Sequence, residues 1–253
     1  MDASTRAVIT AVLAALVAAT AFAQEIPALT QFGRIPVVAA AVVLALVIAI
    51  GWPILLGLPN PIGSSAVIAL GGVGAVITVT ATRGQPLLRE LPVAVALAIL
   101  LSFVNELARQ DGRARLVDSV AGTVTGVLIA TAAAGWVAAV RAPAGSSLVV
   151  CGAVALAVAA AVSAVPLGGV VGSAVTTGAA VLAGGAVGAV MPDLGLGAGA
   201  MLGLATGILI AALHALFDRM PALKSRLAAM SVIALPVALS GILVYVVGRV
   251  LVG

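Results

Sequence analysis

The residues best suited to chemistry lie in one short stretch near the middle of the chain. It contains Glu106, Arg109, Arg113, Arg115 and Asp118. Arginines bind phosphate through paired hydrogen bonds, so this stretch could form a pocket for an anion or a lipid headgroup, in which Asp118 holds a cation or pairs with an arginine. The alternative is a solvated cytoplasmic loop that carries the positive charge usual on that side of a membrane.

A second group of ionisable residues follows later, at His214, Asp218 and Arg219. His214 and Asp218 are four residues apart, so on a helix they share one face. They could relay a proton, or they could form a hydrogen-bonded pair that marks the end of a helix at the membrane surface. Both groups are candidate polar sites, because ionisable residues near membrane depth are costly and so are often functional.

The elements that position these residues are helices in a membrane. The chain has 253 residues, of which 63% are hydrophobic and 8% are charged, whereas soluble domains carry about 25% charged residues. Proline, glycine and charged residues divide the apolar sequence into segments of roughly 20 residues, the length that crosses a bilayer as a helix. We therefore expect an all-α, polytopic transmembrane bundle in which residues 1–253 form one membrane domain.

These interruptions predict about nine spans, although seven to ten remain possible because no charge marks the breaks at Pro59–Pro61 and at Pro166. The predicted spans are residues 7–23, 37–57, 63–81, 91–107, 116–140, 147–165, 168–190, 194–217 and 229–252.

Charge distribution predicts the orientation. With nine spans, seven of the twelve basic residues fall on the side of the N-terminus and five on the other, which favours a cytoplasmic N-terminus. Arginine greatly outnumbers lysine, as in bacterial proteins from GC-rich genomes, so we expect a bacterial cytoplasmic (inner) membrane. The first span also resembles a signal peptide with a cleavage site before Gln24; we expect it to be retained as a helix.

Glycine spacing predicts how the helices pack. Small residues four positions apart lie on nearly one face of a helix and let another helix approach closely. Static packing is one interpretation of such faces, and sliding of helices in a transporter is the other. The glycines with this spacing are Gly122, Gly126, Gly195, Gly199, Gly203 and Gly207.

Composition disfavours several other classes of protein. Cys151 is the one cysteine and His214 the one histidine, so the sequence predicts no disulfide framework, metal site or cofactor. The basic residues are scattered without interleaved aromatic residues, which disfavours nucleic-acid binding. The few amphipathic aromatics, Trp52, Trp136 and Tyr245, are expected to anchor the helices at the lipid–water interface.

Two stretches resemble the phosphatidate cytidylyltransferases. The glycine-spaced helix that begins at Asp118 and runs to Gly126 is similar to an aspartate-bearing helix of that family, and residues 214–219 are similar to its His-to-Asp-Arg signature. The resemblance implies a metal-dependent transfer of a cytidylyl group onto phosphatidate, or a degenerate relative without that activity.

Three functions are therefore open. The first, favoured by glycine-striped and proline-broken helices, is a permease or lipid-handling transporter. The second is an intramembrane lipid-headgroup (cytidylyl) transferase, and the third is a non-catalytic partner in a membrane assembly. The residues favour a function other than catalysis, with membrane lipids as partners and with a second copy or another membrane protein as a further possible partner.

Overall fold

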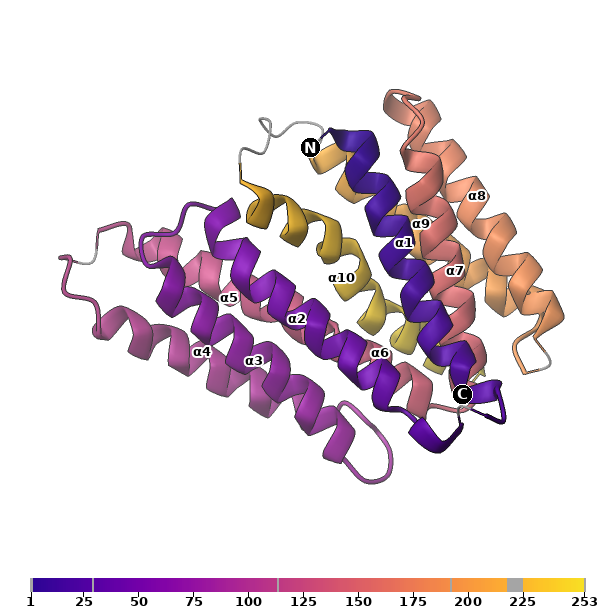
Figure 1. The fold of residues 1–253 in the computed structure, drawn as a ribbon, viewed down its shortest axis with the longest axis horizontal. Coiled ribbons are helices and arrows are strands. Elements are labelled where there is room, and N and C mark those ends of the chain that lie inside the picture. Colours follow the sequence, from indigo (N-terminus) through magenta and orange to yellow (C-terminus); the bar gives the residue numbers. More distant parts are fainter. Residues whose placement is uncertain (1, 29, 113, 192, 218–224, 253) are drawn as a thin grey trace.

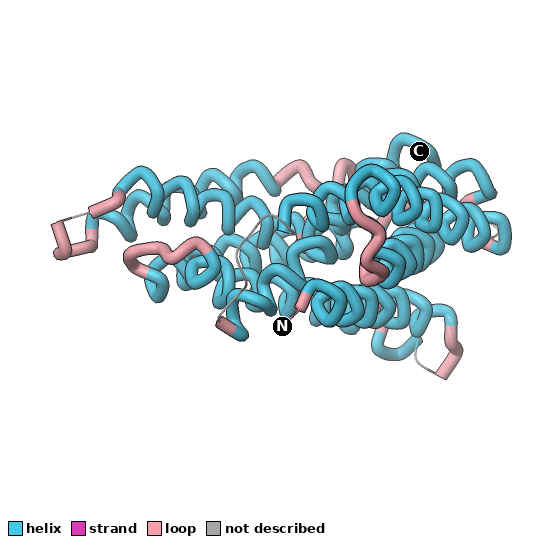
Figure 2. The backbone as a smooth tube through the Cα atoms, turned by 90° about the horizontal axis from the view of Figure 1, so that it is seen from above, coloured by secondary structure: helices cyan, strands magenta, loops and turns pink. Residues whose placement is uncertain are grey.

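The described residues of the computed structural model fold into helices joined by short connections, with no strand among them (Figures 1 and 2). The structure describes all residues except 1, 29, 113, 192, 218–224 and 253. Two short 3-10 turns, η1 (Ala23–Glu25) and η2 (Thr30–Phe32), lie between the first two long helices. The helices are α1 (Ala3–Phe22), α2 (Ile35–Leu55), α3 (Pro61–Ala81), α4 (Leu91–Leu107), α5 (Leu116–Ala132), α6 (Ala134–Arg141), α7 (Gly145–Ser163), α8 (Gly169–Val190), α9 (Gly195–Phe217) and α10 (Arg226–Val252).

Local chemistry sets several of the helix starts. The side chain of Asp2 accepts a hydrogen bond from the Thr5 N–H and so caps α1. Asn60 caps α3 in the same way, and Pro61, which has no N–H to leave unpaired, occupies its first position. The break at Pro59–Pro61 is therefore a true helix boundary.

The predicted nine-span all-α bundle is confirmed within the described residues. Eight segments are long and apolar enough to cross a bilayer, with α5 and α6 together forming the span Leu116–Arg141. The ninth, α4, has 17 residues, which at 1.5 Å per residue gives a length of about 25 Å. The membrane protein expected from composition is thus a multi-pass helix bundle.

One end of the bundle holds the start of α1 and the α2–α3, α4–α5 and α7–α8 connections; we call it the N-terminal end (Figure 1). The Ser4 hydroxyl donates to the Ala164 carbonyl oxygen, 2.9 Å away, which ties α1 to the α7–α8 connection. Arg115 donates to the Gly57 carbonyl oxygen at 3.0 Å and ties the α4–α5 connection to the α2–α3 connection. If successive spans cross the membrane in alternating directions, these connections lie on the same side, and the structure shows that they do contact one another.

The opposite end holds the α3–α4 and α6–α7 connections and the end of α10; we call it the C-terminal end. Arg141, the last residue of α6, donates to the Thr82 carbonyl oxygen at 2.7 Å, just beyond α3. Arg249 donates to the side-chain oxygen of Gln85 at 3.3 Å. These contacts show that α3, α6 and α10 end on the same side.

The helices form two groups that lie at an angle to each other. Figure 1 shows α2 to α6 running across the molecule and α1, α7, α8 and α9 standing more steeply beside them. Helix α10 lies between the groups and packs against members of both, including α2, α6 and α9. The core consequently follows α5, α6, α7 and α10, which are the most buried spans.

The closest helix pair is α8 and α9, which meet through glycine. A methyl group on Gly203 would lie 2.1 Å from the Ala180 carbonyl oxygen, and one on Gly199 would lie 2.2 Å from that of Gly184. Gly207 likewise faces the backbone of α8. Only glycine at these positions lets the two backbones touch, as the four-residue spacing predicts.

The other glycines of the predicted faces have different roles. Gly195 begins α9 with a φ of +75°, a conformation that favours glycine, and a methyl group there would meet nothing within 4 Å. In α5 the glycines receive side chains rather than a second backbone: Leu58 lies against Gly122, and Trp52 and Ile68 lie against Gly126.

The prediction that the aromatics anchor the helices at the lipid interface is wrong. Trp52, Trp136 and Tyr245 are only 9%, 1% and 5% exposed. The indole N–H of Trp52 donates to the Gly122 carbonyl oxygen at 2.9 Å, and that of Trp136 donates to the Val237 carbonyl oxygen at 2.8 Å. The indoles instead join α2 to α5 and α6 to α10, where the carbonyl oxygens satisfy their N–H groups away from water.

Candidate functional site

The first candidate site, at the α4–α5 connection, contains a buried ion pair. Glu106 lies in the last turn of α4 and is 3% exposed. One carboxylate oxygen accepts from the Arg109 guanidinium at 2.5 Å, and the other accepts from the Ser119 hydroxyl of α5, also at 2.5 Å. The pair therefore ties the end of α4 to the first turns of α5.

Arg109 uses all three guanidinium nitrogens within this connection. Besides Glu106, it donates to both carboxylate oxygens of Asp111, at 3.1 and 2.7 Å, and to the Ala114 carbonyl oxygen at 3.0 Å. Hydrogen bonds to Asp111, followed by those to Glu106 and its charge, raise the pKa of Arg109 above its ordinary value. Because its partners belong to the chain itself, Arg109 holds the loop together rather than presenting a free cation to a ligand.

Arg115 and Asp118 form a separate, exposed pair. Their side chains are more than half exposed and lie 3.0 Å apart, so Asp118 does not share the buried environment of Glu106. Arg113 lies outside the described residues. The four described ionisable residues of this group are thus divided between a buried ion pair, Glu106–Arg109, and a solvent-facing pair, Arg115–Asp118.

Neutral polar residues extend this buried cluster toward α3. The Asn60 amide donates to the Asn105 side-chain oxygen at 3.2 Å, and the Thr123 hydroxyl donates to the Ser64 hydroxyl at 2.9 Å. Sequence analysis did not single out Asn60 and Ser64, although an asparagine before a proline is a recognisable cap signal. These contacts join α3, α4 and α5 at the N-terminal end.

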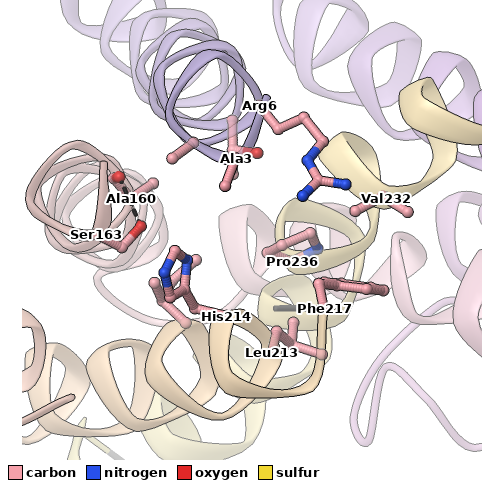
Figure 3. A pocket seen from close by; sticks show the side chains of 12 residues that line it. Ala3, Arg6, Ala160, Ser163, Leu213, His214, Phe217, Val232 and Pro236 are labelled. Atoms are coloured by element: carbon pink, nitrogen blue, oxygen red, sulfur yellow. Dashed lines mark hydrogen bonds between the residues drawn. The ribbon is translucent and has the colours of Figure 1, made fainter. Parts of the chain in front are cut away.

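The second candidate site lies on a cavity of about 50 Å³ between α1, α7, α9 and α10. Figure 3 shows Arg6 from α1 and His214 from α9 pointing into the space between these helices, with Ser163 of α7 beside the histidine. Asp218 and Arg219, predicted to act with His214, lie outside the described residues. The sequence alone gives no reason to pair Arg6 with His214, because nothing around Arg6 in the sequence reveals that four helices converge on it.

A larger groove adjoins the same residues. It has a volume of about 460 Å³, lies between α7, α8 and α9, and is also lined by Ser163 and His214. Most of its wall is apolar, with Val162, Leu167 and Val170 among the lining residues, while Ser173 and Thr176 add hydroxyl groups. The Arg6–His214 cavity and the larger groove are thus lined in common by Ser163 and His214, and of the two only the cavity has a charged residue, Arg6, among its described lining residues.

Among the described residues that line the Arg6–His214 cavity, Arg6 is the one that carries a formal charge. Arg6 is half-buried, and within the described part of the chain its guanidinium forms no hydrogen bond or ion pair. None of the described residues that line the cavity or the groove is a carboxylate. A cation held in partly desolvated surroundings favours an anionic group beside it.

Across the described residues, no group of three or more His, Cys, Asp or Glu side chains is arranged to hold a metal ion. Asp118 is exposed in the first turn of α5, whereas His214 lies on α9 and lines the cavity that α9 forms with α1, α7 and α10. No protein-family model, curated protein or solved structure matches this chain. The resemblance to phosphatidate cytidylyltransferases therefore stays a prediction.

Proposed function

We propose that this multi-pass membrane protein is a lipid-handling transporter, a permease for an amphipathic substrate. The observation that carries the proposal is the pairing of the Arg6–His214 cavity with the apolar groove between α7, α8 and α9. A lipid has a polar headgroup and an apolar chain, and it needs both environments side by side. The two cavities provide them at the N-terminal end of the bundle.

In this proposal the headgroup of the lipid occupies the Arg6–His214 cavity and its acyl chain occupies the groove. By the usual requirement of about 10–15 Å³ per water, the Arg6–His214 cavity of about 50 Å³ holds a few waters or a small anionic group that displaces them. Arg6 supplies a guanidinium for a phosphate oxygen, and Ser163 and His214 line the same cavity. The groove of about 460 Å³ is in the range of ligand pockets, and its apolar wall suits an acyl chain.

The proposal includes an orientation in which this end of the bundle faces the cytoplasm. It is supported by the sequence, in which seven of the twelve basic residues belong to this side and five to the other, the bias that the positive-inside rule associates with a cytoplasmic face. In the bacterial inner membrane the cavities would then take a lipid from the cytoplasmic leaflet. This orientation is part of the proposal.

Transport of a labelled phospholipid between leaflets of proteoliposomes tests the proposal. The protein is reconstituted, and the fraction of fluorescent phosphatidylglycerol accessible to an external quencher is followed over time. We expect the transport rate to fall in Arg6→Gln, because a charge-assisted hydrogen bond contributes about 1.5–3 kcal/mol, equivalent to a loss of roughly tenfold or more.

Arg226→Gln is the matched control. Arg226 begins α10 near the same end, is exposed, and lines neither cavity, so its replacement removes the same charge without touching the proposed site. Equal transport by wild type, Arg6→Gln and Arg226→Gln, or no transport above that of empty liposomes, would contradict the proposal.

A further inference from the structure

A third cavity lies at the opposite, C-terminal end of the bundle. It has a volume of about 680 Å³ and is lined by residues of the α1–α2 connection, the first turn of α2, the end of α3 and α6. Its polar wall consists of Gln24, Thr30, Arg34, Thr80 and Arg141, and none of its described lining residues is a carboxylate. Two guanidinium groups therefore border one cavity.

Arg141 is held in a fixed position on this wall. It donates to the carbonyl oxygens of Val79, Thr80 and Thr82, at 3.1 Å for Thr80 and 2.7 Å for Thr82. These are the last carbonyls of α3, whose helix dipole compensates the charge only in part. The guanidinium therefore stays cationic and in place beside the cavity.

Arg34 supplies the second cation and is free to engage a ligand. It is exposed, and within the described part of the chain its side chain forms no hydrogen bond or ion pair. It directly precedes Ile35, the first residue of α2, where the positive end of the helix dipole adds to the same potential.

Gln24 also lines the cavity, but its side-chain nitrogen is buried within the protein and does not face the open space. The two guanidinium groups favour an oxyanion with several acceptor oxygens.

We propose that this cavity binds a phosphate-bearing anion, with Arg34 and Arg141 as its donors. The phosphate belongs either to the headgroup of an anionic lipid in the adjacent leaflet or to a free phosphate ion. The cavity is in the size range of ligand pockets. The proposal does not depend on the transport function, because it concerns different residues at the other end of the bundle.

Binding measurements on the purified full-length protein test it. One arm measures the retention of phosphatidylglycerol against phosphatidylcholine by native mass spectrometry, and the other measures binding of inorganic phosphate by calorimetry. We expect Arg34→Gln to weaken binding of the anionic probe by about tenfold, the typical effect of losing one charge-assisted hydrogen bond.

Arg83→Gln is the matched control, since Arg83 is an exposed arginine at the same end that does not line the cavity. Selective loss of phosphatidylglycerol in Arg34→Gln identifies a lipid headgroup as the ligand, and selective loss of inorganic phosphate identifies a free ion; either result supports the proposal. Equal weakening in Arg34→Gln and Arg83→Gln, or no preference of the wild type for either anionic probe, overturns it. Neither result bears on Arg6-dependent transport.

Discussion

From the contact between α8 and α9 we predict how much stability the protein loses in Gly203→Ala. The added methyl carbon would lie 2.1 Å from the Ala180 carbonyl oxygen, whereas ordinary contacts begin at 3.4 Å. The neighbouring atom belongs to the backbone and cannot rotate away, so the helices must separate by roughly 1.3 Å. A gap of that order loses a large part of the dispersion energy along the interface, and such overpacking typically costs about 1–3 kcal/mol.

Gly197→Ala separates this cost from the effect of alanine on the helix. Gly197 lies on the same helix, and a methyl group there would meet nothing within 4 Å. Both substitutions gain about 1 kcal/mol from the higher helix propensity of alanine. We therefore expect Gly203→Ala to be less stable than Gly197→Ala by about 1–3 kcal/mol.

The chain's one cysteine provides the assay. Cys151 is fully buried, and its thiol donates to the Gly184 carbonyl oxygen of α8 at 3.3 Å. A thiol-reactive fluorophore reports unfolding when this cysteine becomes accessible, so the melting temperature of detergent-solubilised protein can be compared directly. A Gly203→Ala protein that melts at or above the temperature of Gly197→Ala would refute the proposed backbone contact.

The two ion pairs of the α4–α5 connection should respond differently to neutralisation. Glu106→Gln is expected to lower the melting temperature clearly, because Arg109 loses a buried charged partner; unchanged melting would contradict the structural role assigned to this pair. Asp118→Asn is expected to change stability by less than about 1 kcal/mol, since exposed ion pairs contribute little. If Asp118→Asn instead lost most of its lipid transport while keeping its stability, Asp118 would belong to a functional site.

Much of the fold can be predicted from sequence because lipid imposes simple rules on it. Apolar segments of sufficient length, interrupted by residues such as Pro61 and by the charged stretch around Arg109, define the spans closely. The four-residue glycine spacing indicates the face of α9 that meets α8. The separation of α5 from α6 at Ala133 was not predicted, because no proline or glycine occupies that position.

The candidate sites are harder to predict because they depend on contacts between distant segments. Arg6 and His214 are far apart in the sequence and come together only because α1 and α9 enclose the same cavity. Glu106 and Asp118 are close in sequence yet differ sharply in burial, since Ser119 and Arg109 enclose only the glutamate. The tryptophans were misassigned for a related reason: amphipathic rings suit both the lipid interface and a buried carbonyl partner.

The most direct test of the proposed transport function is the position of a bound lipid. A photoreactive phosphatidylglycerol analogue, with the reactive group on its acyl chain, is cross-linked to the reconstituted protein and the modified peptides are identified by mass spectrometry. The account predicts cross-links to the residues that line the groove between α7, α8 and α9, and a loss of those cross-links in Arg6→Gln but not in Arg226→Gln. Cross-links spread evenly over the lipid-facing helices, unchanged in Arg6→Gln, would contradict it.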